Sequence, residues 1–168
     1  MKNAICVIAT VAVLSMTTAA YSQAPASPPL SLKLSVTPST AKAGSNFVVE
    51  VDLTNTSSQR IAIDICSAMR VECNFDISVR DSHENSPSET PYLKAVRGEP
   101  TGSPNLVILK SFGPRSIEPG ETVKFVSNLP KLFDLSRPDL YEIQVERGDL
   151  DKKMTVKSNI SHIVVSAQ

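Results

Sequence analysis

The stretch NFVVEVDLTN, residues 46–55, decides the fold class because its apolar and polar side chains alternate from Val49 to Thr54. In an extended chain one face carries Phe47, Val49, Val51 and Leu53, and the other carries Glu50, Asp52 and Thr54. Side chains of a β-strand alternate between the two faces of its sheet, so this pattern predicts a strand with one buried side.

The same period of two recurs along the rest of the chain, with turn residues between most of the runs. Further strands are expected at residues 30–36, 61–65, 75–79, 105–112, 122–126, 141–145 and 160–165. Pro119 and Gly120 occupy the central positions of a type II turn over residues 118–121, and residues 129–139 have room for one helical turn. Seven or eight short strands in this arrangement predict an all-β fold, an antiparallel β-sandwich.

The N-terminus has the order of a secretory signal peptide. Lys2 precedes an apolar run over residues 4–14, and small residues follow at 18–20. A membrane anchor is the alternative, but the apolar run is shorter than the roughly 20 residues that span a bilayer. Cys6 lies inside the run, where it cannot serve as a lipid-bearing cysteine. We therefore expect residues 1–22 to be cleaved and the protein to be secreted or periplasmic.

Behind the signal peptide, residues 23–29 read as a stiff proline-rich leader, and residues 30–168 have the length of one domain. The net charge without the signal peptide is about −1. Since there is no basic run or basic excess, we expect no nucleic-acid partner, and no later apolar segment is long enough for membrane insertion. His83 and His162 are not at metal-ligand spacing, so neither a metal nor a cofactor is expected.

Two cysteines follow the signal peptide, Cys66 and Cys73 in DICSAMRVEC. Their spacing matches neither a redox Cys-x-x-Cys motif nor a paired zinc knuckle. An oxidising compartment favours a disulfide. Closing a loop of about eight residues is worth about 2.5 kcal/mol on the chain-entropy relation. Two free thiols or a metal site are the alternatives.

Four stretches combine into a larger pattern. They are FVVEVDLTNTSSQRIAIDI (residues 47–65), IEPGETVKF (117–125), FDLSRPDLYEIQV (133–145) and VKSNISHIVV (156–165). Together they resemble immunoglobulin-like and fibronectin-type-III-like domains of exported bacterial proteins, in which a proline-glycine turn opens one strand and a tyrosine begins the next. The resemblance implies an immunoglobulin-like β-sandwich in which residues 47–65 form a hairpin.

The resemblance also implies that Tyr141 is the corner tyrosine of the sandwich, with its hydroxyl bonded to upstream backbone. Asp139 stands where such domains usually carry glycine. A weaker similarity, to bacterial proteinase-inhibitor domains of the same sandwich type, rests on the same turn and tyrosine. Because these motifs belong to a superfold, they specify no activity.

The tripeptide Arg147-Gly148-Asp149 falls, on this template, at the start of the loop that joins the last two strands. Fibronectin's adhesive domain presents the same tripeptide in that loop, so receptor-directed adhesion is one hypothesis for these residues. Glycine and aspartate are also ordinary turn residues, and a solvated turn is the alternative.

Residues 81–104 interrupt the strand pattern with four prolines and two glycines around YLKAV, residues 92–96. We expect a long excursion with one short edge strand, and loops of this length in compact domains are usually either functional or disordered. The expected contact residues are the apolar anchors Tyr92, Leu93 and Val96, with Arg97 and Glu99 at the rim.

These observations predict an exported, non-catalytic binding or accessory module that contacts a protein or a surface polymer through residues 81–104. A structural envelope domain is one alternative. A hydrolase that uses His83, with Asp81 beside it, is another. The glycosylation sequons at Asn55 and Asn159 are interpreted as polar turn residues.

Overall fold

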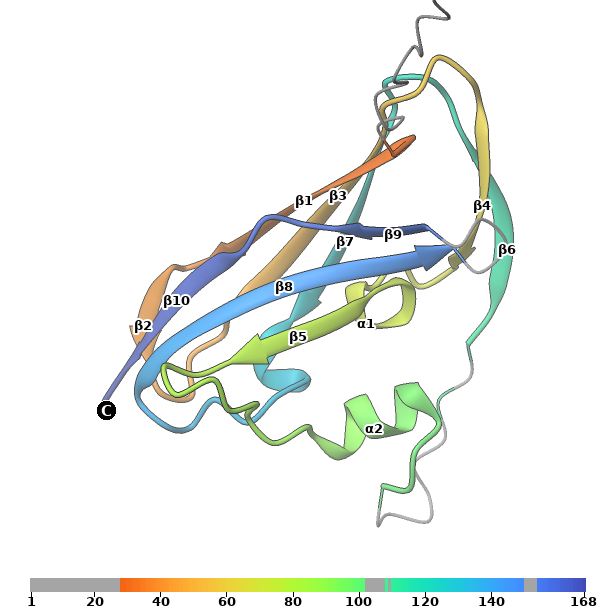
Figure 1. The fold of residues 1–168 in the computed structure, drawn as a ribbon. Helices are drawn as coiled ribbons and strands as arrows, with labels where there is room; N and C mark the ends of the chain where they lie inside the picture. Colours follow the sequence, from red (N-terminus) through yellow and green to blue (C-terminus); the bar gives the residue numbers. More distant parts are fainter. Residues whose placement is uncertain (1–27, 102–107, 109, 150–153) are drawn as a thin grey trace, which may run out of the picture.

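Figure 1 shows the computed structural model of the chain, which describes residues 28–101, 108, 110–149 and 154–168. These residues form an all-β protein whose strands are mostly antiparallel, as the sequence predicts. The expected signal peptide (1–22) and residues 23–27 of the expected leader lie outside the described ranges.

The described residues form ten strands and three short helical segments. The strands are β1 (Leu30–Thr37), β2 (Thr40–Lys42), β3 (Val48–Asn55), β4 (Ile61–Cys66), β5 (Asp76–Arg80), β6 (Phe112–Ile117), β7 (Thr122–Asn128), β8 (Asp139–Asp149), β9 (Met154–Lys157) and β10 (Ser161–Ser166). The helical segments are α1 (Val71–Asn74), α2 (Pro91–Arg97) and the 3-10 turn η1 (Leu129–Lys131).

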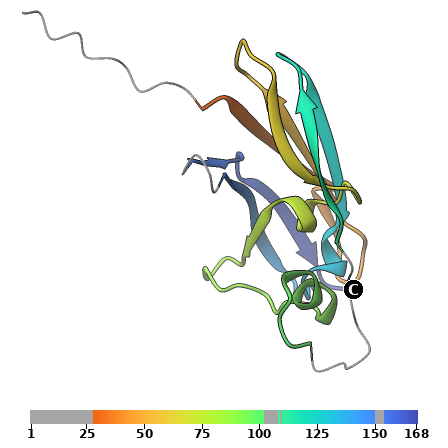
Figure 2. The same ribbon diagram turned by 90° about the vertical axis from the view of Figure 1, so that its right-hand side faces the viewer.

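Two sheets form the layers of the sandwich, which Figure 2 shows side by side. The first sheet has the order β1-β3-β7, and the second has the order β2-β10-β8-β5 with β9 paired to the end of β8. β2 and β10 pair in parallel, and the other described pairs are antiparallel. The strand number exceeds the expected seven or eight because β2 and β9 are too short to show an alternating pattern.

The apolar face predicted for residues 47–53 forms the centre of the core. Val51 on β3 is fully buried and pairs with Leu34 of β1 on one side and Phe125 of β7 on the other. The ring of Phe125 meets the ring of Phe75 edge to face, with centroids 4.9 Å apart. Since Phe75 leads into β5 of the second sheet, this aromatic pair joins the two layers.

The structure corrects the hairpin expected over residues 47–65. β3 lies between β1 and β7, so both of its edges are occupied. β4 instead pairs with β6, from Ile61 opposite Ile117 to Cys66 opposite Phe112. The two strands form a separate ribbon, and β5 rather than β4 lies at the edge of the second sheet.

The strand expected over residues 105–112 is also displaced. Residues 105–107 and 109 lie outside the described ranges, while Ile108 and Lys110 are described and belong to no strand. β6 begins at Phe112, because its pairing with β4 rather than its own apolar run determines where the strand lies.

The two turn predictions are confirmed. Gly120 has a positive φ of 77°, as the third position of a type II turn requires, and the Glu121 N–H donates to the Glu118 carbonyl at 3.0 Å. The helical turn expected within residues 129–139 is η1. Within the described ranges, no helix has the length and apolar character that crossing a membrane requires.

Residues 91–97 form helix α2, so the edge strand expected at YLKAV is wrong. The Thr90 hydroxyl accepts a hydrogen bond from the Leu93 N–H at 3.2 Å, and Pro91 occupies the first turn. Gly98 ends the helix in the left-handed conformation, with a φ of 78°. These are the start and stop signals of a short helix, and they outweigh the local strand preference of the five-residue run.

Candidate binding site

The structure contradicts two of the apolar anchors expected on residues 81–104. Leu93 is 1% exposed and Val96 is 3% exposed. They lie on the face of α2 that turns toward the interior, and Leu93 belongs to the main apolar core. These two side chains stabilise the domain itself and are not available to a partner.

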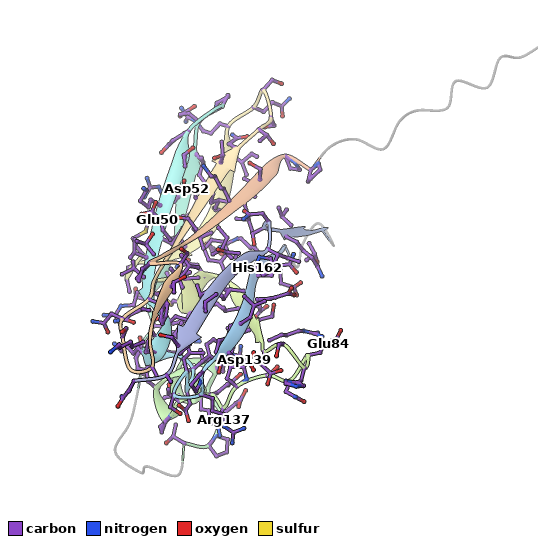
Figure 3. All side chains as sticks on the ribbon, turned by 90° about the vertical axis from the view of Figure 1, so that its left-hand side faces the viewer. Glu50, Asp52, Glu84, Arg137, Asp139 and His162 are labelled. Carbon is purple, nitrogen blue, oxygen red and sulfur yellow. A yellow bond between two sulfur atoms is a disulfide. The ribbon has the colours of Figure 1, made fainter. Side chains whose placement is uncertain are left out.

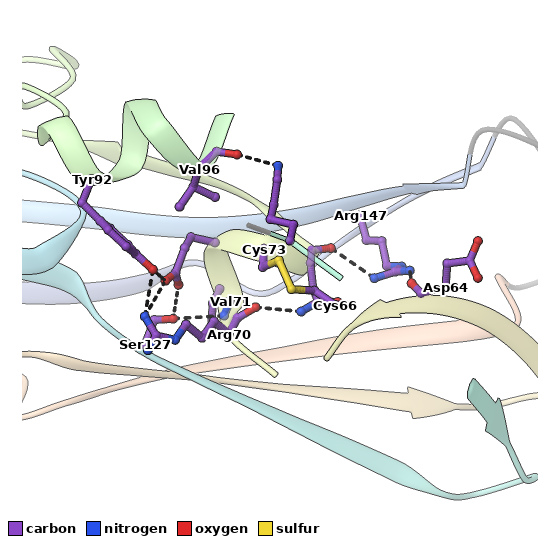
Figure 4. Close-up of a disulfide and its surroundings, with 12 residues drawn as sticks. Asp64, Cys66, Arg70, Val71, Cys73, Tyr92, Val96, Ser127 and Arg147 are labelled. Atoms are coloured by element: carbon purple, nitrogen blue, oxygen red, sulfur yellow. Dashed lines mark hydrogen bonds and ion pairs between the residues drawn. A yellow bond between two sulfur atoms is a disulfide. The ribbon is translucent and has the colours of Figure 1, made fainter. Parts of the chain in front are cut away.

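Tyr92 is half-buried and is bonded within the domain, as Figure 4 shows. Its hydroxyl donates to a carboxylate oxygen of Glu72 at 2.9 Å and accepts from Arg70 Nη1 at 2.8 Å. The ammonium of Lys131 lies 4.1 Å from the centre of its ring. Tyr92 therefore attaches α2 to the sandwich.

Arg97 and Glu99 are the two expected contact residues that remain exposed. The Arg97 guanidinium forms an ion pair with Glu89, and the Glu99 N–H donates to the Lys94 carbonyl at 2.9 Å. The described part of this segment, residues 81–101, thus includes an exposed loop that begins at Asp81 and a docked helix, and only the loop retains the character expected of a contact segment.

The Arg147-Gly148-Asp149 tripeptide ends strand β8 and is not a turn, because it pairs with β9. The Arg147 guanidinium donates to the backbone carbonyls of Asn74 at 3.1 Å and Asp64 at 2.5 Å. It also lies 5.8 Å from the centre of the Phe75 ring. The Arg147 side chain is therefore bonded to other parts of the domain.

The two expected structural features are present. Cys66 and Cys73 form a disulfide, which is the pairing that the sequence predicts. Tyr141 is buried, and its hydroxyl donates to the Arg137 carbonyl at 2.9 Å, four residues upstream. Both features stabilise the fold of the domain.

A hollow of about 640 Å³ lies over the outer face of β5 and β8. On one side it is bounded by the loop over residues 81–84, and on the other by Lys157 and Ile160. Ile160 and Leu140 are apolar side chains in its lining that are 50% and 43% exposed. The two strands bring together residues that are about 65 positions apart in the sequence, so no local motif predicts this hollow.

The lining of this hollow carries an excess of negative charge. Its acids are Asp76, Asp81, Glu84, Glu142 and Glu146, and its basic residues are Arg80 and Lys157. Lys157 Nζ lies 3.2 Å from Glu146, and His162 Nε2 at the border lies 3.1 Å from Glu142. We call this region the acidic hollow, and Figure 3 shows Glu84 and His162 on that side of the molecule.

A second hollow, of about 370 Å³, lies between α2 and the ends of β5 and β8. Its lining includes Cys73 and three basic residues, Arg97, Lys110 and Arg147. Lys110 donates to the Val96 carbonyl at 2.5 Å and Arg147 to the Asn74 carbonyl at 3.1 Å, while Arg97 forms an ion pair with Glu89. These internal bonds favour a structural role for the smaller hollow.

The structure brings Asp139 next to the expected pair of His83 and Asp81, with ligand atoms of all three within 4.8 Å of one another. One Asp81 oxygen accepts from the N–H groups of His83 at 2.9 Å and Asn85 at 2.8 Å. Asp139 accepts from the Leu140 N–H at 2.7 Å. Asp81 thus orders the backbone of its own loop, and Asp139 lies beside that loop at the start of β8, which gives aspartate a role where a glycine was expected.

Acidification is expected to release this loop from β8. The Ser82 side chain bonds to the Asp139 carboxylate and lowers its pKa from the ordinary 3.8; the backbone N–H groups of Leu140 and Ser82 and the nearby His83 act in the same direction, against burial. A carboxyl group whose folded pKa is lowered stabilises the fold fully above its ordinary pKa. That contribution disappears as the pH falls through the lowered value.

An acid titration followed by NMR will check this expectation at the Leu140 and Ser82 amides. Both signals should move together with a midpoint below 3.8. The matched variant Asp139→Asn should abolish the step at both amides. A wild-type Leu140 signal that stays constant through the titration contradicts the tether.

Comparison with protein families and with curated proteins adds no identification: no family model and no curated protein matches the chain. The fold and the geometry of the site therefore carry the functional argument. They define an all-β sandwich with an open acidic hollow on one outer face.

Proposed function

We propose that the protein is an exported, non-catalytic binding module with an immunoglobulin-like sandwich, and that it contacts a partner protein through the acidic hollow. The strand order supports the finer class. β1-β3-β7 corresponds to strands A, B and E of an immunoglobulin-like domain, and β5-β8-β10 corresponds to C, F and G. The signal-peptide pattern and the disulfide agree with an exported protein.

The observation that carries the proposal is the combination of shape, charge and exposed apolar surface in one place. Exposed apolar side chains with a polar rim are typical of interaction sites, and Leu140 and Ile160 meet that description at the acidic hollow. On the outer face of the opposite sheet, Lys124 lies 2.6 Å from Glu50 and 4.0 Å from Asp52, so a single cation there lies close to both acids.

The exposed loop keeps a part of the role expected for residues 81–104. It contributes Asp81, Ser82 and Glu84 to one wall of the hollow. A rigid sandwich that presents such a loop is a common way for this fold to carry a binding site. The contact region proposed here is therefore the face of β5 and β8 together with this loop.

Cross-linking capture from the producer's envelope extract and culture medium tests the proposal. The test variant is the double substitution Leu140→Ser and Ile160→Ser. The matched control is Val48→Ser and Val126→Ser, which changes two exposed valines on the outer face of the opposite sheet, each 43% exposed. All four side chains are about half exposed to solvent. The free energy of unfolding of both variants should therefore be within about 1 kcal/mol of that of the wild type.

We expect the wild type and the control to retain the same cross-linked partner and the test variant to lose at least four-fifths of it. Cross-linked peptides should map to the β5 and β8 face. Equal capture by both variants would refute the proposed site. Failure of the wild type to capture any partner would refute the binding module and favour a structural envelope domain.

A further inference from the structure

Two carboxylates face each other at one end of the acidic hollow. Asp76 of β5 is opposite Glu146 of β8 in the sheet register, and both residues line the hollow. Directly opposed residues on one face have Cβ atoms about 4.5–5.5 Å apart, and like charges in that position are destabilising. An acidic pair in this ladder costs stability unless a cation neutralises it.

Within the described part of the chain, only one carboxylate of this pair, that of Glu146, has an ion-pair partner. Lys157 Nζ lies 3.2 Å from a carboxylate oxygen of Glu146, and the Lys157 side chain is 60% exposed. Among the described residues, no hydrogen bond or ion pair reaches the carboxylate of Asp76. Asp76 therefore has no direct cationic partner among the described residues, although it also lines the smaller hollow together with Arg97, Lys110 and Arg147.

The other end of the hollow has a second acidic group. Glu142 lies on the same face of β8 as Glu146 and four residues before it. Glu142 is opposite Arg80 in the register and has His162 beside it, and the loop adds the acids Asp81 and Glu84. At about 3.3 Å per residue, the two acidic ends are roughly 13 Å apart along the strand.

Resting on the function proposed above, we propose that the partner contacts the acidic hollow with an extended, cationic polypeptide segment. A Lys or Arg side chain at position i of the segment seats between Asp76 and Glu146, and a second one at i+4 seats beside Glu142 and Glu84. Even spacing is needed because side chains of an extended chain alternate between its faces.

Charge complementarity selects this occupant over a second copy of the protein. A second copy would bring an identical acidic face, and two such faces repel each other. An anionic polymer would meet the same repulsion. A basic segment, in contrast, gains attraction at both ends and is guided toward the hollow during encounter.

Fluorescence anisotropy with synthetic peptides tests the inference on the full protein at low salt. The probe is a labelled peptide of Thr and Val with two Lys residues at i and i+4. One matched peptide moves the second Lys to i+3, and another carries Glu in place of both Lys residues. We expect the i+4 peptide to bind at least about five-fold more tightly than the i+3 peptide, and the Glu peptide not to bind.

Protein variants with equal charge changes separate a specific site from general attraction. Asp76→Asn with Glu146→Gln should weaken the i+4 peptide about ten-fold, whereas Glu50→Gln with Asp52→Asn on the opposite sheet should change its affinity less than two-fold. Equal weakening by both pairs, or equal binding of the i+3 peptide, would overturn the inference. Added salt should reduce the affinity, since the contacts are exposed charges.

The two proposals fail in distinguishable ways. If the Leu140 and Ile160 variant loses its captured partner but the lysine peptides do not bind, the acidic hollow remains a binding site and the cationic segment is refuted. If the peptide binds in an Asp76-dependent manner while that variant keeps its partner, the cation site stands and the proposed protein-docking face is refuted.

Discussion

Replacement of Glu72 by alanine is expected to lower the free energy of unfolding by about 3 kcal/mol, because it removes the centre of a buried polar cluster. The Glu72 side chain is 2% exposed. It accepts hydrogen bonds from the hydroxyls of Tyr92 and Ser127, and Arg70 Nη1 lies 3.9 Å away. Since Arg70 is 46% exposed and can turn to water, we expect the lower end of the range for a broken buried pair.

The Glu72 side chain connects three elements of the fold, so its loss affects all of them. Glu72 belongs to α1, Tyr92 to α2, and Ser127 to β7, so the carboxylate joins both helices to the first sheet (Figure 4). Ser127 Oγ also accepts the first N–H of α1, from Val71, at 3.0 Å. Without Glu72 we expect α2 to loosen while the sandwich remains folded.

Urea unfolding gives the stability change, and a tyrosine titration gives the local one. Burial, followed by the hydrogen bond to Glu72, raises the pKa of Tyr92 above 10.0, and Arg70 opposes that shift. Loss of the carboxylate should therefore lower the Tyr92 pKa. The pKa of Tyr141, which is raised by burial and by nearby Asp139, should not change.

The control for this prediction is Glu72→Gln. The amide keeps the shape and one acceptor oxygen, so the expected loss is about 1 kcal/mol with a smaller shift at Tyr92. An alanine variant that unfolds at the wild-type urea concentration would show that the cluster contributes nothing net to stability.

Local alternation was sufficient to predict most of the strands. Residues 49–54 alternate because one side of β3 is buried against the core, and that cause acts at every residue of the strand. The turn at Gly120 was predictable for a similar reason, since its positive φ is a property of the local chain.

The errors occurred where contacts outside the local alternation decide the structure. YLKAV is short enough to fit either a strand or a helix, and Leu93 becomes buried only because the core lies beneath α2. Arg147 looked like part of a turn because its partner strand β9 is only four residues long. The acidic hollow depends on the β5 and β8 register, which places Asp76 opposite Glu146, and no local pattern contains that register.

Replacement of Asn55 by alanine is expected to lower the free energy of unfolding by about 3 kcal/mol, because the side chain is fully buried and makes four hydrogen bonds. Its Nδ2 donates to the carbonyls of Gln59 at 2.7 Å and Ile117 at 2.9 Å. Its Oδ1 accepts from the N–H of Ser57 at 2.9 Å and from its hydroxyl at 2.8 Å. The substitution leaves the buried Ile117 carbonyl without this donor.

These bonds make Asn55 the junction of two turns at the same end of the sandwich. The backbone of Asn55 also bonds to Gly120 at 2.9 Å and to Glu121 at 3.1 Å, in the type II turn. The side chain connects the loop after β3 with the end of β6, which joins the ribbon to the first sheet. The loss should therefore appear as destabilisation of the whole domain and not as fraying of one loop.

Urea unfolding of Asn55→Ala, Asn55→Asp and Asn159→Ala separates this role from the general cost of losing an asparagine. Asn55→Asp removes both donors and sets a buried carboxylate oxygen against the two carbonyls, so it should lose at least as much as alanine. Asn159 is exposed, although it bonds to the backbone of Leu34 at 2.9 and 3.1 Å, and its alanine variant should lose only about 1 kcal/mol. Equal losses at Asn55 and Asn159 would mean that burial of the side chain is not what makes Asn55 important. A larger loss at Asn55 would instead place the junction between the ribbon and the first sheet among the contacts on which the fold most depends.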